Sequence, residues 1–313
     1  MVRRAVIDIG TNSVKLLVAD VDGALVVPVF EESEQTRLGK GFYETQILQP
    51  DVMADTASVV AQFAGIARVR NSASLRVIAT SAARDAQNQA EFLEAIKLAS
   101  GLEVEIISGQ QEADLVYQGV RSDPKLAGRR LMILDVGGGS SEFMIGQGEL
   151  PEFSRSFALG SVRLLEMMRP SDPPASVELE RCRAYLRKFF AEHLREPLTT
   201  ALADGRDRTT LVGTGGSATI LARMEYALDK YSRHQIEGAR IPLGSIHGWM
   251  KKLWSMPLAE RRKITGLPKK RADVILMGMA IFETVLEEFG FAELRASTRG
   301  LRFAAVMQAP VAA

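Results

Sequence analysis

The feature that most constrains how this chain can fold is a short polar turn that occurs twice. The sequences DIGTNS (residues 8–13) and DVGGGS (residues 135–140) place Asp, Gly and Ser at a constant offset of 127 residues. Each turn directly follows an apolar segment of the kind that forms a buried strand. The same turn after the same element, at so long a period, indicates two diverged copies of one structural unit.

The order of elements around the two turns agrees with a duplication. Apolar or alternating segments predict strands at residues 5–9, 14–21 and 24–30, and helices then alternate with strands as far as residue 119. Residues 121–130 are polar and contain a proline and a glycine, as expected of a surface connection. After them the strands recur and further helices are inserted. We therefore expect an α/β protein with domains at residues 1–124 and 125–313.

Composition narrows the class of protein. The 313 residues include 39 Lys or Arg and 38 Asp or Glu, so the chain lacks the wide positive field of a nucleic-acid binder or a membrane-surface protein. The longest segment without a charged side chain has 14 residues (209–222), fewer than the roughly 18 to 20 that span a bilayer. The N-terminal apolar run is cut at Asp8, too early for a secretory signal. We expect a soluble, cytoplasmic protein that binds neither nucleic acid nor membrane, and a structural role for its single cysteine, Cys182.

A strand that ends in Asp and turns through glycine and hydroxyl residues can bind phosphate and its metal ion. Such a turn places a carboxylate beside exposed backbone N–H groups, and glycine, which has no Cβ, lets a phosphate oxygen approach. A third loop, GTGGS (213–217), follows an apolar strand and begins a helix, whose N-terminus favours an anion. The candidate phosphate-binding residues are Gly10, Thr11, Asn12, Ser13, Gly137, Gly138, Gly139, Ser140, Gly215, Gly216 and Ser217. The candidate ligands of Mg²⁺ or another divalent cation are Asp8, Asp135 and Glu142.

Other nucleotide and metal motifs do not fit this sequence. It contains no GxxxxGK[ST] stretch, and its glycines do not follow the order of a dinucleotide-binding GxGxxG fold. The three histidines, His193, His234 and His247, are far apart and lack the spacing of zinc ligands. A P-loop enzyme and a zinc hydrolase are therefore disfavoured.

Seven segments, in order along nearly the whole chain, resemble one family. They are DIGTNSVKLLVAD (8–20), TRLGKG (36–41), ATSAARDAQN (79–88), ISGQQEA (107–113), LDVGGGSSEF (134–143), LGSVRL (159–164) and GTGGSATILA (213–222). Together they resemble the exopolyphosphatase and guanosine pentaphosphate phosphatase family, within the superfamily of actin, Hsp70 and sugar kinases. The chain is similar to the short form, without the helical C-terminal extension. The resemblance implies two ribonuclease-H-like (actin-like ATPase) domains flanking a central cleft, and a homodimer.

The resemblance also implies an activity and roles for individual residues. The activity is Mg²⁺-dependent hydrolysis of the terminal phosphoanhydride of inorganic polyphosphate or of pppGpp. Glu112 falls on the family's catalytic base and Arg84 on a phosphate-binding arginine, while Asp135 and Glu142 match the acidic residues of its glycine-rich motif. Two departures occur: Gln111 replaces the first of two glutamates, and residues 300–304 read GLRFA where the family has GLREG.

The residues alone leave other functions open. A phosphotransferase of the same superfamily would move phosphate between ATP and an acceptor, and a nucleotide-gated scaffold like actin would bind partners without turnover. Six cations within residues 261–271 form either a track for polyphosphate or a solvated surface.

Overall fold

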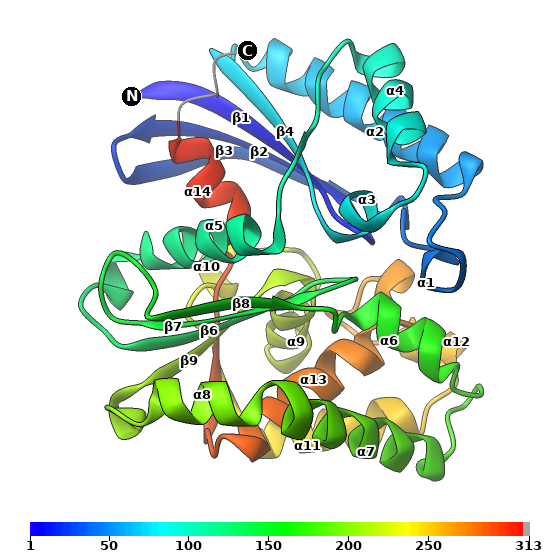
Figure 1. The fold of residues 1–313 in the computed structure, drawn as a ribbon, viewed down its shortest axis with the longest axis vertical. Helices are drawn as coiled ribbons and strands as arrows, with labels where there is room; N and C mark the ends of the chain where they lie inside the picture. The colour runs from blue at the N-terminus through cyan, green and yellow to red at the C-terminus, as the bar shows by residue number, and fades with distance from the viewer. Residues whose placement is uncertain (309–313) are drawn as a thin grey trace. The chain divides into compact units, whose positions relative to one another are not determined.

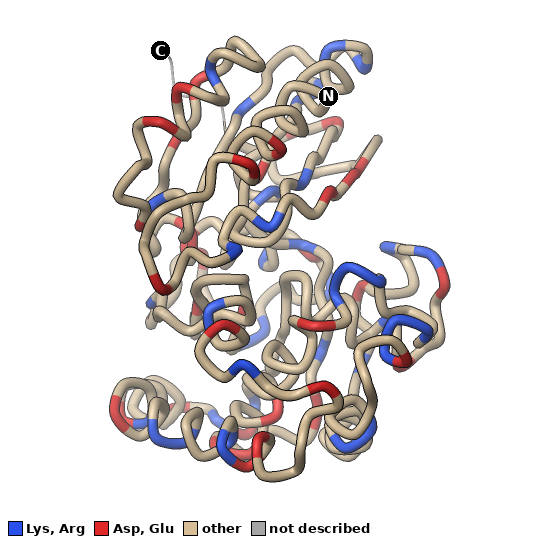
Figure 2. The backbone as a smooth tube through the Cα atoms, turned by 90° about the vertical axis from the view of Figure 1, so that its right-hand side faces the viewer, with Lys and Arg blue, Asp and Glu red and all other residues tan. Residues whose placement is uncertain are grey.

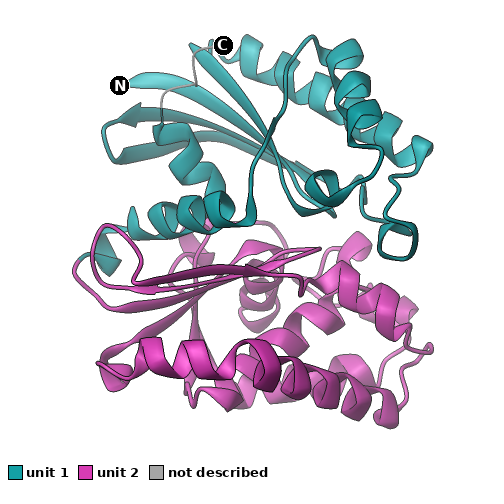
Figure 3. Ribbon diagram, viewed as in Figure 1, with its two compact units in different colours: residues 1–127, 299–313 teal, residues 128–298 magenta. Residues whose placement is uncertain are grey.

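The computed structural model describes residues 1–308, which divide into two compact units (Figure 3). Unit 1 comprises Met1–Ala127 together with residues 299–308, and unit 2 comprises Gly128–Thr298. This division differs from the predicted domains at the C-terminal end, because the residues after Thr298 pack with the N-terminal half. The order of elements along the sequence gives no sign of this return.

Unit 1 is built on a five-stranded sheet with the strand order β3-β2-β1-β4-β5. The first three strands form an antiparallel meander, whereas β4 runs parallel to β1, and β5 parallel to β4. The strands are β1 (Val2–Ile9), β2 (Val14–Asp22), β3 (Leu25–Glu34), β4 (Ser74–Ala79) and β5 (Glu105–Ile106). The helices are α1 (Phe42–Thr45), α2 (Pro50–Val69), α3 (Ser81–Asp85), α4 (Gln89–Ser100), α5 (Gly109–Arg121), the 3-10 turn Pro124–Leu126 and α14 (Leu301–Met307).

Helices cover both faces of this sheet (Figure 1). On one face, alternate side chains of β1 and β2, among them Ile7 and Leu16, pack against α2 and form a core with α4. On the other face α14 packs on β1, β2 and β3, and α5 packs on α14. Two arginines anchor α14: Arg4 Nη1 donates to Met307 O at 2.8 Å, and Arg302 Nη1 donates to Leu16 O at 2.9 Å. These contacts are the reason why the C-terminal helix belongs to unit 1.

Helix α2 is long and apolar enough to cross a membrane on length and composition alone. Its buried residues, which include Val60, Phe63, Ala64 and Ala67, recur at the three-to-four-residue spacing of one helix face. That face contributes to the core of unit 1. The packing identifies α2 as a core helix.

Unit 2 is built on a six-stranded sheet with the order β10-β11-β9-β6-β7-β8. The strands are β6 (Leu131–Val136), β7 (Ser141–Gly146), β8 (Phe153–Phe157), β9 (Thr210–Thr214), β10 (Arg240–Pro242) and β11 (Glu293–Ala296). The helices are α6 (Ser161–Met168), α7 (Ser176–His193), α8 (Arg195–Leu202), α9 (Gly215–Glu225), α10 (Arg233–Ile236), α11 (Leu243–Trp254), α12 (Leu258–Arg261) and α13 (Ile275–Glu288), with 3-10 turns at Arg206–Arg208 and Lys269–Arg271.

The two sheets share one topology. The order β3-β2-β1-β4-β5 corresponds to β8-β7-β6-β9-β11, and β10 adds an edge strand to unit 2. The register agrees as well, because Asp8 pairs with Lys15 in unit 1 and Asp135 pairs with Glu142 in unit 2, at the same offset of 127 residues. The duplication that the turns predict is confirmed.

Two helical details differ from the sequence prediction. Apolar spacing predicts one helix over residues 177–198, but α7 and α8 are separate because the backbone at Leu194 leaves the helical region (φ −120°, ψ −37°). Helix α6 has little sequence signal, because it follows Gly160 and begins with Ser161, residues that are typical of loops.

Gly119 of α5 determines how closely this helix approaches the start of α14. A Cβ added at this position would lie 2.1 Å from Gly300 O, which is backbone and cannot rotate away. We predict that Gly119→Ala lowers the free energy of unfolding by about 2–3 kcal/mol, as overpacking of a close contact does. Urea unfolding followed by circular dichroism measures the change.

Gly65→Ala in α2 is the matched control for this substitution. Apart from its chain neighbours and the backbone of its own helix, no atom of the described residues lies within 4 Å of the position that its Cβ would occupy. The added methyl should therefore only raise helix propensity and stabilise the protein by about 0.5–1 kcal/mol. Equal effects of the two substitutions would contradict the role assigned to the α5–α14 contact.

Cys182 lies in the core of unit 2, where it contacts Met277 at 3.9 Å between the two sulfur atoms. Burial, and secondarily the negative charge of Glu283, raises the pKa of its thiol from an ordinary value of 9.0 to about 12. The Cys182 thiol of the folded protein therefore keeps its proton at a pH where the same thiol in the unfolded chain has lost it. The stability contributed by this group is fully present below about pH 8.5 and is lost as the pH rises toward 12.

We predict that Cys182 does not react with iodoacetamide at pH 8 in the folded protein, because the thiolate is the reactive form. Mass spectrometry should show complete labelling in urea and almost none in buffer over the same time. Since the chain has one cysteine, the assay is unambiguous, and rapid labelling in buffer would show that the thiol is accessible and ionised.

Candidate phosphate-binding site

The two polar turns have the same backbone geometry. In unit 1 the amide of Gly10 donates to Ser13 O at 3.1 Å, and in unit 2 the amide of Gly137 donates to Ser140 O at 3.0 Å. Both turns join the first strand of their unit to the second, so each turn begins at the carboxyl end of the central strand β1 or β6.

Neighbouring segments determine which way the peptide groups of the first turn face. Thr11 O accepts from the amide of Gly39 at 2.7 Å, and Asn12 O accepts from the amide of Arg37 at 3.2 Å. In a planar trans peptide the N–H points opposite to the C=O. The amides of Asn12 and Ser13 therefore point away from residues 37–39.

The second turn follows the same rule with a different partner. The amides of Ser161 and Val162, at the start of α6, donate to Gly137 O at 3.0 Å and to Gly138 O at 2.8 Å. The amides at positions 138 and 139 therefore point away from α6. Each turn thus presents consecutive N–H groups on one side, the arrangement that binds anions.

Buried polar atoms in unit 1 fit an oxygen-rich ligand. Among the described residues, Asn12 Nδ2 and Ser81 Oγ are buried without a hydrogen-bonding partner. Their elements meet where β1 and β4 end, since the amide of Thr80 donates to Ile9 O at 3.2 Å. An unpaired buried donor costs free energy that a bound phosphate oxygen would recover. Ser81 is not among the residues that the turn motifs predict, although its position in TSAAR, directly after a strand, is a signal of the same kind.

The predicted metal ligands do not have the same surroundings. Asp135 and Glu142 are direct cross-strand partners and so lie side by side on one face of the sheet, and Ser156 Oγ donates to Glu142 Oε1 at 2.7 Å. In unit 1 the partner of Asp8 is Lys15. Two adjacent carboxylates suit a hard divalent cation such as Mg²⁺, so the donor set fits such an ion better in unit 2.

The third loop lies beside Asp135 within unit 2. Gly215 has a positive φ of +83°, and a Cβ at this position would lie 2.2 Å from Asp135 Oδ1. Parallel pairing of Asp135 with Thr214 brings β6 and β9 to this common edge. The structure therefore brings together Asp135, Glu142 and the loop at residues 213–217.

Arg271 contacts the same loop. Its Nη2 atom lies 3.4 Å from the position that a Cβ on Gly216 would occupy. In the sequence, Arg271 stands out only as a member of the basic cluster at residues 261–271. A cationic fork beside a glycine-rich helix start adds positive charge where an anion would bind.

The remaining members of the basic cluster differ in their surroundings. Arg261 is buried and donates to Ala272 O at 3.1 Å, and Lys263 pairs with Glu260 at 2.6 Å. Arg262, Lys269 and Lys270 are exposed. Figure 2 shows basic and acidic residues interspersed along the backbone of both units. The cluster thus contains one structural arginine, one loop contact and several surface cations.

Glu112 and Arg84 form an ion pair in unit 1. Arg84 Nη1 lies 3.1 Å from Glu112 Oε2 and also donates to Ile107 O at 3.1 Å. The side chain of Glu112 is 13% exposed and that of Arg84 is 21% exposed. Both residues follow the carboxyl ends of neighbouring strands, because Ile9, Ala79 and Ile106 are in register on β1, β4 and β5. Turn, arginine and glutamate therefore come from adjacent strand ends.

The capping of α5 explains the departure at Gln111. Ser108 Oγ accepts from the amide of Gln111 at 3.2 Å, and Gln111 Oε1 accepts from the amide of Ser108 at 2.8 Å. This reciprocal capping box uses the side chain at position 111 to complete the helix N-terminus. Glu112 is therefore the one first-turn carboxylate of α5.

Comparison with known proteins gives one consistent result. The model of the Ppx/GppA phosphatase family matches residues 17–308. Exopolyphosphatase 2 of Mycobacterium tuberculosis is 32% identical over 298 residues, which cover 92% of this chain and 91% of that protein. A crystal structure of the Aquifex aeolicus member of the Ppx/GppA family has 32% identity and a TM-score of 0.80, covering 98% of this chain and 96% of the other. An exopolyphosphatase structure from Cytophaga hutchinsonii has 27% identity and a TM-score of 0.86, with 96% of each chain covered.

Each of these similarities extends over more than nine-tenths of this chain and of the protein compared with it. They confirm the fold class that the sequence motifs imply, two ribonuclease-H-like (actin-like ATPase) domains.

Gly160 controls how closely α6 approaches the second turn. A Cβ at this position would lie 2.3 Å from Gly138 O and 2.5 Å from the carbonyl carbon of Gly139. We predict that Gly160→Ala displaces the turn, lowers the free energy of unfolding by about 2 kcal/mol and weakens the binding of orthophosphate at least roughly tenfold. Isothermal titration calorimetry measures the affinity.

Gly244→Ala in α11 is the control, because within residues 1–308 its added Cβ would have no atom within 4 Å other than those of its chain neighbours and its own helix backbone. It should leave orthophosphate affinity unchanged. If Gly160→Ala also binds orthophosphate with unchanged affinity, the second turn does not bind phosphate.

Proposed function

Because the chain belongs to the Ppx/GppA phosphatase family and is a phosphoanhydride hydrolase, we propose that it removes the terminal phosphate of inorganic polyphosphate as orthophosphate. The observation that carries this proposal is the duplicated turn. In each turn consecutive amides point away from the segment whose N–H groups bond the turn's carbonyls. A polyanion of repeated phosphate units requires several such groups. The exopolyphosphatase names of the relatives favour polyphosphate over pppGpp.

Glu112 is proposed as the general base. Water is a weak nucleophile toward a polyanion, so the site must take a proton from it as the bond to phosphorus forms. A carboxylate has two oxygens with about four acceptor positions, so Arg84 can hold Oε2 while the carboxylate accepts a proton from water. Its partial burial limits competing water.

Arg84 is proposed to orient Glu112 and to bind a phosphate oxygen. Its bond to Ile107 O fixes the guanidinium against the end of β5, so one end is anchored while its planar fork offers further N–H groups. An arginine so placed can hold the base and the substrate in one geometry.

The two turns and the third loop are proposed to bind phosphate oxygens through backbone amides, hydroxyls and Arg271. Asp135 and Glu142 of unit 2 are the residues proposed to hold Mg²⁺, and a metal-binding role for Asp8 of unit 1 stays a prediction. The bound cation would neutralise charge on phosphate oxygens. Mg²⁺ dependence, a homodimer and a cytoplasmic location stay predictions.

We predict that Glu112→Gln lowers kcat by about 10²- to 10⁴-fold with little change in KM, because the amide keeps the shape of the side chain and cannot accept the proton. The measurement is orthophosphate release from polyphosphate of defined length, with Mg²⁺ and with EDTA. Asp114→Asn is the matched control, since Asp114 lies on the same helix and its carboxylate accepts a hydrogen bond from Gln110. A Glu112→Gln enzyme with near-full kcat would sink the assignment of the base.

The same assay separates the alternative functions. Release of phosphate from polyphosphate without an acceptor excludes a phosphotransferase, and turnover excludes a scaffold. If pppGpp is hydrolysed and polyphosphate is not, the substrate assignment fails while the hydrolase assignment stands.

A further inference from the structure

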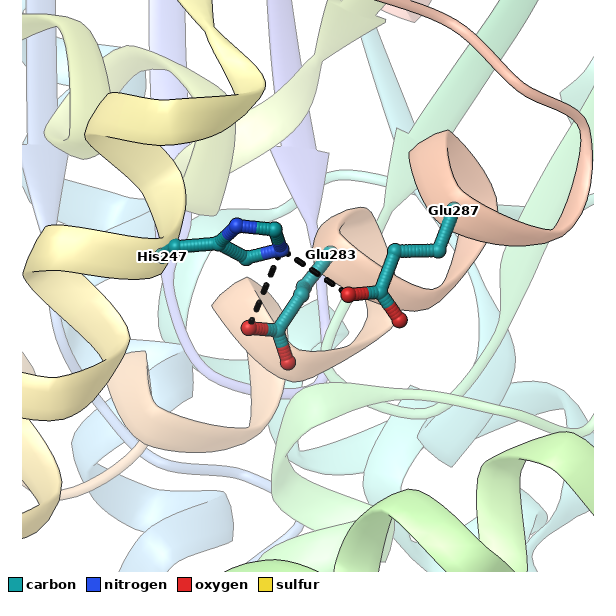
Figure 4. A group of neighbouring side chains, drawn as sticks. All are labelled: His247, Glu283 and Glu287. Atoms are coloured by element: carbon teal, nitrogen blue, oxygen red, sulfur yellow. Dashed lines mark hydrogen bonds and ion pairs between the residues drawn. The ribbon is translucent and has the colours of Figure 1, made fainter.

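A second group of ligating side chains lies in unit 2, outside the glycine-rich loops. His247 on α11 faces Glu283 and Glu287 on α13 (Figure 4). The His247 Nε2 atom lies 2.8 Å from Glu287 Oε1 and 3.9 Å from Glu283 Oε1. All three ligating atoms lie within 4.8 Å of one another.

Helix geometry explains why these residues meet. Glu283 and Glu287 are four residues apart on α13, so their side chains project from the same face one turn apart. Helix α11 packs against α13 and contributes His247 from the side. The spacing of histidines in the sequence gives no hint of this group, because two of its three members are glutamates from another helix.

Burial and charge distinguish this group from an ordinary surface ion pair. Glu283 is fully buried, and Arg183 holds it with two bonds, from Nε to Oε2 at 2.9 Å and from Nη2 to Oε1 at 2.7 Å. Arg183 also binds Glu180 at 2.8 Å. Glu180 also pairs with Arg187 at 3.9 Å. With a neutral imidazole, the carboxylates of Glu180, Glu283 and Glu287 therefore exceed the two guanidinium groups by one negative charge, which a bound cation would offset.

The position of the three atoms suits a metal ion that accepts nitrogen and oxygen ligands. Zinc binds imidazole nitrogen and carboxylate oxygen at about 2.0–2.2 Å, which places neighbouring ligand atoms of a tetrahedron roughly 3.3–3.5 Å apart. The distances of 2.8 and 3.9 Å from His247 Nε2 lie on either side of that value. Each carboxylate oxygen has two lone pairs, so Glu283 Oε1 can accept from Arg183 and bind a metal as well.

We propose that His247, Glu283 and Glu287 form a binding site for a divalent transition-metal ion such as Zn²⁺. The metal takes the place of the proton between His247 Nε2 and Glu287 Oε1. The imidazole keeps its remaining proton on Nδ1, and any second proton is released to solvent. His247 and Glu287 are 45% and 44% exposed, so the ion enters from the surface and completes its coordination with water.

The metal at this site links two helices and so stabilises unit 2. It joins α11 to α13, and α13 also contacts the third loop, because a Cβ on Gly278 would lie 2.1 Å from Ser217 Oγ. The site differs in chemistry from the proposed Mg²⁺ site, which offers oxygen ligands alone. It takes no part in the proposed hydrolysis.

The test is titration of Zn²⁺ into the full chain after removal of metals with EDTA and dialysis. Excess Mg²⁺ is present throughout to occupy the oxygen-rich sites. Calorimetry should show one Zn²⁺ bound per chain, and the midpoint of thermal unfolding should rise. His247→Gln and Glu287→Gln should each weaken binding at least roughly tenfold and remove the thermal shift, since each deletes one ligand.

His234→Gln is the matched control, because His234 is an exposed histidine on α10 in the same unit. It should bind Zn²⁺ like the wild type. Equal affinity and thermal shift in wild type and His247→Gln would overturn the proposal, as would equal losses in His247→Gln and His234→Gln. Circular dichroism verifies that each variant is folded, and Glu287→Gln provides an independent test from the other helix. These readouts do not involve phosphate release, so they stand or fail separately from the proposed function.

Discussion

The requirement that buried peptide groups be hydrogen-bonded determines the shape of the proposed phosphate site. In both turns the carbonyls are bonded by a segment that follows later in the chain: residues 37–39 in unit 1 and the start of α6 in unit 2. Because a peptide group is planar, fixing its carbonyl also fixes the direction of its N–H. The amides are therefore oriented before any ligand binds, and the cost of ordering them has been met by folding.

The two halves kept this backbone and diverged in charge. Position 15 is a lysine and its counterpart, position 142, is a glutamate, each paired across the sheet with the aspartate that ends the first strand. The change makes one aspartate the neighbour of a cation and the other the neighbour of a carboxylate. A divalent cation is favoured beside two carboxylates, whereas the ion pair of Arg84 and Glu112 lies in unit 1. Divergence of a duplicated scaffold thus places the paired carboxylates of Asp135 and Glu142 in unit 2, whereas the proposed base belongs to unit 1.

Local sequence signals predicted most of the strands and long helices, and the repeat predicted the shared topology. They could not predict features that depend on contacts distant in sequence. The return of α14 to unit 1 depends on Arg4, which bonds Met307 across 303 residues of sequence, and on Gly119, which leaves room for Gly300. Likewise, the sequence shows Arg271 only as one of six clustered cations, and the packing of the folded chain places it beside Gly216. The positive charge of a residue is visible in the sequence, but its neighbour is not.

The glutamine at position 111 keeps the N-terminus of α5 capped. A glutamine side chain accepts the Ser108 amide through its carbonyl oxygen as a glutamate would, so the capping box survives the loss of the charge. The carboxylate at position 112 remains beside Arg84, whose guanidinium is held by the end of β5. A proton acceptor needs one carboxylate in a fixed position, and this pair supplies it. In this chain the side chain at position 111 caps the helix, and the proposed base, Glu112, is the one carboxylate in the first turn of α5.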